Sequence, residues 1–107
     1  MFPCVVYHLH GSALWAIDDL VQLPGVAVIE LNLEAANCDV EGTFAGWKKI
    51  QKHKPLIMWR ACGDDFSAWL ARVRKEFPSK GLSIQVSAYN ADDAKKVKEG
   101  FFSYENH

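Results

Sequence analysis

The sequence contains no long apolar run, no pair of closely spaced cysteines and no glycine-rich loop. Its hydrophobic runs are far shorter than the ~20 residues of a membrane-spanning helix, and the N-terminus has neither a basic stretch nor a cleavage site. The formal net charge is only -1, which predicts neither nucleic acid nor an anionic membrane as a partner. Together these absences predict a soluble, cytoplasmic protein.

Cysteine is also scarce. The chain has three cysteines, Cys4, Cys38 and Cys62, which are widely spaced and include no CxxC pair. An odd number in this arrangement argues against a disulfide framework and against a structural zinc knuckle, so we expect free thiols in a reducing compartment. A phosphate-binding loop, a serine nucleophile elbow and an EF-hand are absent too, and the enzyme classes that these motifs mark are not indicated.

What the chain does contain is a regular alternation of apolar and amphipathic segments. Half of its 107 residues are hydrophobic, which is enough for the core of a single domain over residues 1–107. We expect strands at 4–11, 26–33, 56–61 and 82–88, and helices at about 13–22, from about 43 to Pro55, at about 66–77 and after Asn90. A βαβαβαβα order implies an α/β fold with a parallel sheet and right-handed crossovers.

The expected strands share a second pattern. Each has one uniformly apolar face; the other face begins apolar and turns polar at its C-terminal end in the first three strands, and is polar throughout in the fourth. One apolar face suits helices mainly on one side of the sheet, and polar groups at the C-terminal ends are typical of the inside of a (β/α)8 barrel. Four βα units therefore predict half of such a barrel. A flavodoxin-like, three-layer arrangement is the alternative.

The polar ends are predicted to gather as a rim, where a small ligand would bind. The predicted rim residues are His8, His10, Glu30, Asn32, Arg60, Cys62, Gln85 and Ser87. Among them His8, His10 and Glu30 form a two-histidine, one-carboxylate set that suits zinc or ferrous iron. Two other interpretations stay open at this point. One is a metal-free polar network in which Glu30 pairs with Arg60 or an imidazole, and the other is an anion or small-ligand site that uses Arg60.

Four short segments give the chain a family resemblance. Residues 7–11, 23–26, 47–50 and 84–87 resemble the C-terminal half of the uroporphyrinogen decarboxylase-like superfamily, near its corrinoid and coenzyme M methyltransferase branch. The resemblance extends over nearly the whole chain. It implies a (β/α)8 barrel whose members are about three times as long as this chain.

The resemblance also implies a zinc site in the methyltransferase branch, and this chain departs from it. His8 matches the zinc-binding histidine, His10 stands where a cysteine ligand is expected, and Ser87-Ala88 lies near the expected final cysteine. One ligand is thus kept, one is replaced by another ligand type and one is missing. This departure argues against thiol-activating methyl transfer.

Half a barrel would leave one sheet face open. On that face Val6, Val26, Val28, Leu56 and Met58 would meet water, which predicts a homodimer. Three functions follow from these observations. The leading one is a non-catalytic, small-ligand-binding homodimer derived from a barrel enzyme, with zinc as a candidate cofactor. The others are a small zinc-dependent lyase or transferase, and a module that docks on another barrel fragment.

Overall fold

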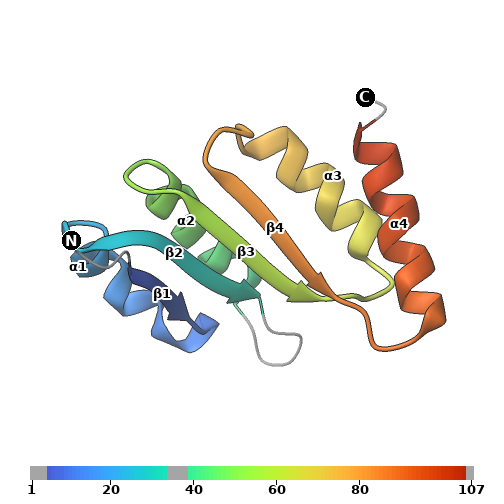
Figure 1. Ribbon diagram of the computed structural model, residues 1–107, viewed down its shortest axis with the longest axis horizontal. Coiled ribbons are helices and arrows are strands. Elements are labelled where there is room, and N and C mark those ends of the chain that lie inside the picture. The colour runs from blue at the N-terminus through green and yellow to red at the C-terminus, as the bar shows by residue number, and fades with distance from the viewer. Residues whose placement is uncertain (1–4, 34–38, 106–107) are drawn as a thin grey trace. The chain divides into compact units, whose positions relative to one another are not determined.

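The computed structural model describes residues 5–33 and 39–105, which belong to an α/β fold built from four βα units (Figure 1). Two compact units can be distinguished. The first contains Met1–Arg60 and Lys80–Gln85, and the second contains Ala61–Ser79 and Val86–His107. The alternation of strands and helices predicted from the sequence is confirmed.

Four parallel strands form the sheet. They are β1 (Val5–Leu9), β2 (Val26–Leu33), β3 (Leu56–Ala61) and β4 (Leu82–Ser87), in the spatial order β1-β2-β3-β4. Paired residues share a face, so the register places His8 opposite Glu30, and Leu31 opposite Met58. The order differs from the 2-1-3-4 order of a flavodoxin-like sheet, which was the alternative expectation.

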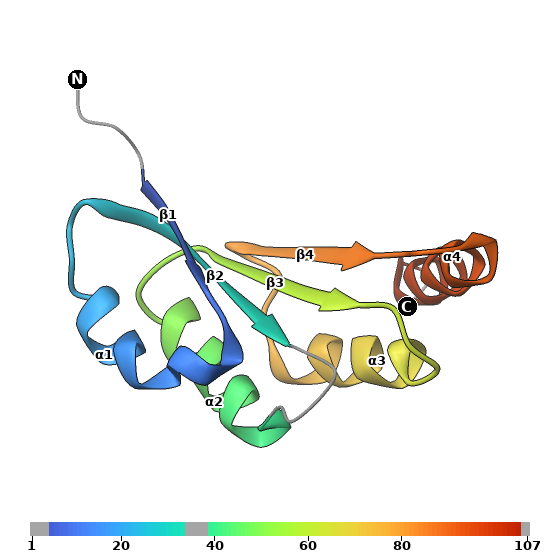
Figure 2. The same cartoon turned by 90° about the horizontal axis from the view of Figure 1, so that it is seen from below.

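In the first unit the helical segments η1 (Gly11–Ala16), α1 (Ile17–Leu20) and α2 (Val40–Gln51) lie on the same side of the sheet (Figure 2). Gly46 lets α2 approach closely, because a β-carbon there would lie 2.8 Å from Ile17 Cδ1 and 3.2 Å from Leu31 Cδ2. Trp47 is fully buried, and its indole Nε1 donates a hydrogen bond of 3.0 Å to the Leu31 carbonyl. This bond ties α2 to β2.

Two helix predictions need correction. The helix expected at 13–22 is a 3-10 segment followed by a single α-helical turn, because no side chain caps it and Ala13 has non-helical dihedral angles. The second helix begins at Val40 rather than Thr43, because the Asp39 carboxylate accepts a hydrogen bond of 2.8 Å from the Gly42 amide. Residues 34–38, and Cys4 near the N-terminus, lie outside the described residues; Cys38 is one of the former.

The face assigned to β3 from the sequence was wrong. Leu56 and Met58 lie opposite Ile29 and Leu31 and are buried on the helix-covered face, and Arg60 follows them there. Both faces of β3 are apolar up to Arg60, so the sequence pattern does not reveal which face points toward the helices. A shift of one residue exchanges the side chains of the two faces.

Three of the five side chains expected to meet water are therefore buried. Leu56 and Met58 are buried because the face of β3 that carries them is the one covered by helices. Val26 is buried as well, because the β1–β2 register shifts by one residue and places Val26 opposite Val5. Only Val6, which is exposed, and Val28, which is half-buried, follow the expectation.

The second unit is built on the contact between α3 (Phe66–Glu76) and α4 (Ala91–Glu105). The Phe66 ring stacks on Trp69 and lies 5.8 Å, centroid to centroid, from Phe101. Gly100 faces the same ring, since a β-carbon there would lie 2.7 Å from Phe66 Cε1. None of the helices in the described ranges is long and apolar enough to span a membrane.

The close approach at Gly46 can be tested by substitution. Gly46→Val should lower the free energy of unfolding by about 1–3 kcal/mol, because the added methyl groups would overlap Ile17 and Leu31. Gly25→Ala is the control, since a β-carbon at Gly25 meets no atom within 4 Å. Urea unfolding measures both changes, and equal stability of the two variants would contradict this description of the packing.

Candidate functional site

Three polar side chains meet on the sheet face opposite the helices of the first unit. His8 comes from β1, and Glu30 and Asn32 come from β2. His8 Nδ1 is paired with Glu30 Oε2, and Asn32 Nδ2 lies 3.1 Å from His8 Nε2. The predicted approach of Glu30 to an imidazole is thus found in the structure, and we call these three residues the His8 network.

The partners of His8 fix the direction of each hydrogen bond in the network. A carboxylate can only accept, so His8 Nδ1 must carry a proton and donate to Glu30. In the neutral ring Nε2 is then an acceptor, and it receives a hydrogen bond from the Asn32 amide nitrogen. The amide oxygen of Asn32 consequently points elsewhere.

That oxygen is the exceptional atom of the network. Asn32 is only 5% exposed and its Oδ1 is buried. This oxygen nevertheless has no hydrogen-bond partner in the described part of the chain. An unsatisfied buried acceptor costs about 1–3 kcal/mol, so native structures contain few of them. Glu30 is also largely shielded, with 15% of its side chain exposed, whereas the His8 side chain is 49% exposed.

The predicted zinc ligands lie near one another without forming a metal site. The His8 and His10 rings are 4.8 Å apart in an edge-to-face arrangement. Within residues 5–33 and 39–105, no three His, Cys, Asp or Glu side chains are placed to hold a metal ion. Both ring nitrogens of His8 already have partners. The pairing of Glu30 with an imidazole is one of the contacts that the sequence left open.

Arg60 and Gln85 are not part of the His8 network. Arg60 is 7% exposed and pairs in register with Leu33, which places it on the opposite face of the sheet. Of the two partners expected for Glu30, Arg60 or an imidazole, the structure shows the imidazole of His8. Gln85 is exposed on β4, the strand at the far edge of the sheet.

The structure adds Trp59 to this face of the sheet. Trp59 lies opposite Asn32 in the parallel register, and Ile57 lies opposite Glu30; both are half-buried. The expectation that Leu56 and Met58 would meet water implied the opposite face for both residues. No signal within β3 marks Trp59 as a site residue, because its neighbours on both faces are apolar.

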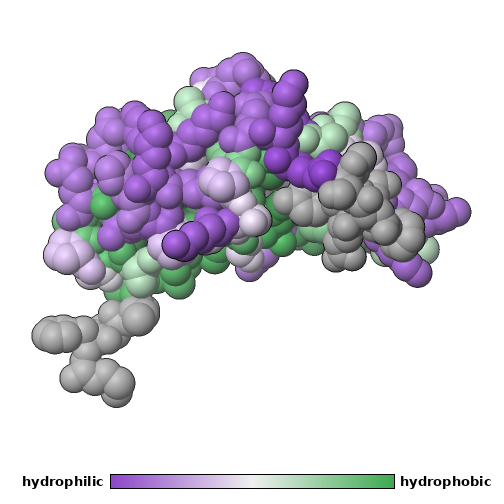
Figure 3. Space-filling model, turned by 90° about the horizontal axis from the view of Figure 1, so that it is seen from above, coloured by the Kyte–Doolittle hydropathy of each residue, from purple (hydrophilic) through white to green (hydrophobic). Residues whose placement is uncertain are grey.

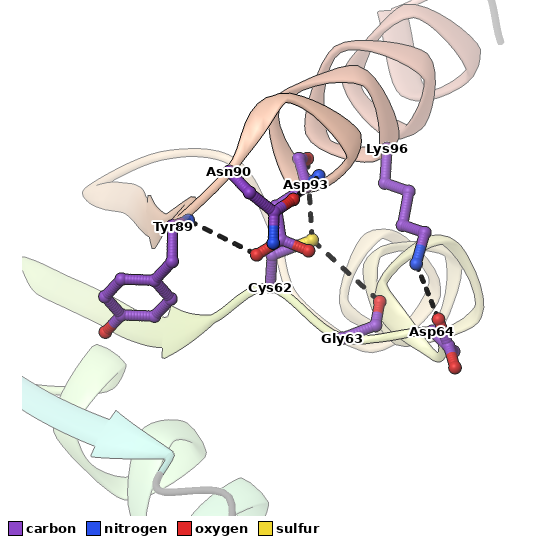
Figure 4. Close-up of polar contacts among 7 residues, drawn as sticks. All are labelled: Cys62, Gly63, Asp64, Tyr89, Asn90, Asp93 and Lys96. Atoms are coloured by element: carbon purple, nitrogen blue, oxygen red, sulfur yellow. Dashed lines mark hydrogen bonds and ion pairs between the residues drawn. The ribbon is translucent and has the colours of Figure 1, made fainter.

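The two remaining rim candidates, Cys62 and Ser87, belong to the second unit. The Cys62 amide donates a hydrogen bond of 2.9 Å to the Ser87 carbonyl. The Cys62 thiol is free of disulfides and lies 3.6 Å from the Asp93 carbonyl and 3.9 Å from that of Gly63 (Figure 4). A thiol hydrogen aimed at backbone carbonyls indicates a packed structural cysteine.

The first turn of α4 surrounds this thiol. Asn90 caps the helix as predicted, because its Oδ1 accepts a hydrogen bond of 2.8 Å from the Asp93 amide (Figure 4). The Asp93 carboxylate in turn accepts one from the Tyr89 amide. Lys96 reaches from α4 to Asp64, with Nζ 2.6 Å from Oδ1.

With this geometry established, the chain was compared with known proteins. No protein-family model, no curated protein and no solved structure matches it.

The Lys96–Asp64 pair makes stability depend on pH. The hydrogen bond from Lys96 lowers the pKa of Asp64 below 3.8, and the same bond raises the pKa of Lys96 above 10.5. The stabilising contribution of Asp64 is complete above about pH 3.8 and is lost as the pH falls through its folded-state pKa. The stabilising contribution of Lys96 is complete below about pH 10.5 and is lost as the pH rises through its folded-state pKa.

Asp64→Asn should therefore reduce the loss of stability between pH 5 and strongly acidic pH, as measured by urea unfolding at each pH. The effect should be small and should shrink at high salt, because both groups lie at the surface. Lys96→Met completes a double-mutant cycle at pH 7. If the two substitutions were simply additive, the coupling would be absent.

Proposed function

We propose that this protein is a non-catalytic, small-ligand-binding homodimer in which two half barrels join. The observation that carries the binding proposal is that Asn32 Oδ1 has no hydrogen-bond partner among the described residues. The open edge and open face of the sheet support the assembly. The order β1-β2-β3-β4 suits half of a (β/α)8 barrel, whose ligands bind at the C-terminal ends of the strands.

The His8 network is suited to binding a ligand through hydrogen bonds. Asn32 is held in place by His8, and His8 is held by Glu30, so the free amide oxygen has a fixed direction. A ligand with an N–H or O–H group would satisfy this oxygen and recover its desolvation penalty. With both ring nitrogens engaged, His8 orients Asn32, which favours binding over proton transfer.

The edge strand β1 supports the homodimer. Among the described strands β1 pairs only with β2, and Val5, Val6 and Tyr7 are 42%, 54% and 43% exposed. Figure 3 shows hydrophobic surface, in green, where the chain enters β1. Exposed edge strands usually carry charged side chains that prevent pairing, and these three positions carry none.

A second copy fits this edge without like-charge repulsion. In a two-fold pair, β1 of each copy would form parallel-strand hydrogen bonds with β4 of the other copy. The two-fold symmetry makes these two contacts identical, and together they would leave no open sheet edge. The half-buried Val28 and Ile57 would then face the inside of an eight-stranded ring. The His8 network would lie at its rim.

Substituting Asn32, whose Oδ1 has no partner among the described residues, tests whether this side chain is retained for binding. Asn32→Leu should raise the free energy of unfolding by about 1 kcal/mol, because it removes the unsatisfied acceptor and leaves His8 Nε2 within reach of water. The matched control is Asn90→Leu, which should lower stability by about 1 kcal/mol, since Asn90 caps α4. A marked loss of stability in Asn32→Leu would show a structural role instead.

Binding itself is measured by NMR with a fragment set containing cationic, anionic and neutral molecules. We expect at least one fragment to shift the Asn32 side-chain amide signals saturably in the native protein. The Asn32→Leu protein, whose fold is monitored by the signals of its other residues, should lose that binding. If no fragment of any charge shifted the Asn32 signals, the binding proposal would be wrong.

The homodimer is tested by light scattering. The native protein should have twice the mass of the chain, and Val6→Lys should raise the dissociation constant about a hundredfold or more, because burying an unpaired ammonium group costs several kcal/mol. Trp15→Lys is the control, since Trp15 is 81% exposed on η1, away from the edge. A native monomer, or equal weakening by both substitutions, would contradict the assembly.

A further inference from the structure

The His8 network holds acceptor atoms that its own hydrogen bonds leave unused, one of them buried. The Asn32 Oδ1 atom has no partner in the described residues, and the Oε1 atom of Glu30 takes no part in the pair with His8. His8 directs its ring proton toward Glu30 and receives the Asn32 amide hydrogen. A ligand in this position must therefore supply N–H or O–H donors.

The charge of the network restricts the ligand further. Because Asn32 Nδ2 faces His8 Nε2, that ring nitrogen is the acceptor, and the carboxylate of Glu30 is the charged group of the network. The buried cation Arg60 lies on the opposite face of the sheet. Lys49 on α2 pairs with Asp18, and Lys54, in the turn between α2 and β3, donates to the Leu23 carbonyl. A negatively charged, partly desolvated site favours a cation over an anion.

An aromatic side chain lies beside these acceptors. Trp59 is opposite Asn32 in the β2–β3 register and shares its face, with Ile57 two residues before it. An indole attracts a cation through its ring face, and the attraction strengthens when water is excluded. Carboxylate, amide oxygen and indole together form a set that recognises a positively charged nitrogen attached to an apolar body.

We propose that the ligand of the His8 network is a small organic cation of the ammonium or amidinium class. Its N–H groups donate to Asn32 Oδ1 and to the Glu30 carboxylate, and its charge lies against Trp59. This inference rests on the proposed ligand-binding function and specifies the chemistry of the same site.

Three probes with the same four-carbon chain separate charge from size: n-butylammonium chloride, sodium butyrate and n-butanol. They are titrated into the native protein at pH 8 while NMR follows the Asn32 side-chain amide and the indole N–H of Trp59. Only n-butylammonium should shift both signals saturably. The indole signal of Trp15, which is exposed on η1, should stay unchanged and serves as an internal control.

Variants separate the charge of Glu30 from its hydrogen bond. Glu30→Gln keeps an acceptor for His8 Nδ1–H but removes the charge, and it should weaken n-butylammonium binding at least tenfold. Trp59→Leu should weaken it severalfold, whereas Trp15→Phe should leave it unchanged.

The outcomes distinguish this inference from the proposed function. Saturable binding of butyrate or butanol in place of n-butylammonium would overturn the cation class and leave the ligand-binding function standing. Equal n-butylammonium binding by Glu30→Gln and the native protein would also overturn it. If none of the three probes shifted the signals, the cation class would be wrong, and the fragment measurement would decide the function separately.

Discussion

The parallel register between β1 and β2 is the constraint on which the candidate site depends. It places His8 opposite Glu30, and the alternation of β2 then places Asn32 on the same face, within reach of the same ring. A shift of one residue would place His8 opposite Leu31 or Ile29 and would send its side chain into the helix-covered core. Ile29, Leu31 and Leu33 are buried on the helix-covered face of β2, which keeps Glu30 and Asn32 on the other face.

The sequence was informative where the two faces of a strand differ in polarity. On β1 and β2, polar and apolar residues alternate clearly enough to predict that His8 and Glu30 share a face and that Glu30 approaches an imidazole. On β3 the alternation is lost, since Leu56, Ile57, Met58 and Trp59 are all apolar. Arg60, as the first polar residue, suggested the wrong face.

The rest of the site could not have been predicted from the sequence. That Asn32 donates to His8 and leaves its own oxygen without a partner depends on distances of a few ångströms between side chains. The metal expectation shows the same limit. Two histidines and a carboxylate do share a face, but the Asn32 amide takes up His8 Nε2, and no three ligand-type side chains are placed around one point in the described ranges.

The bond between Trp47 and the Leu31 carbonyl has a consequence for the opposite face of the sheet. The Leu31 carbonyl and the backbone nitrogen of Asn32 belong to one planar peptide group. By binding that carbonyl, the Trp47 indole on the helix side fixes the peptide group that leads directly into Asn32. Repacking around Trp47 would tilt that plane and move the amide on the far side. Evolutionary change in the interior of this unit is thereby coupled to the His8 network on the other face of the sheet.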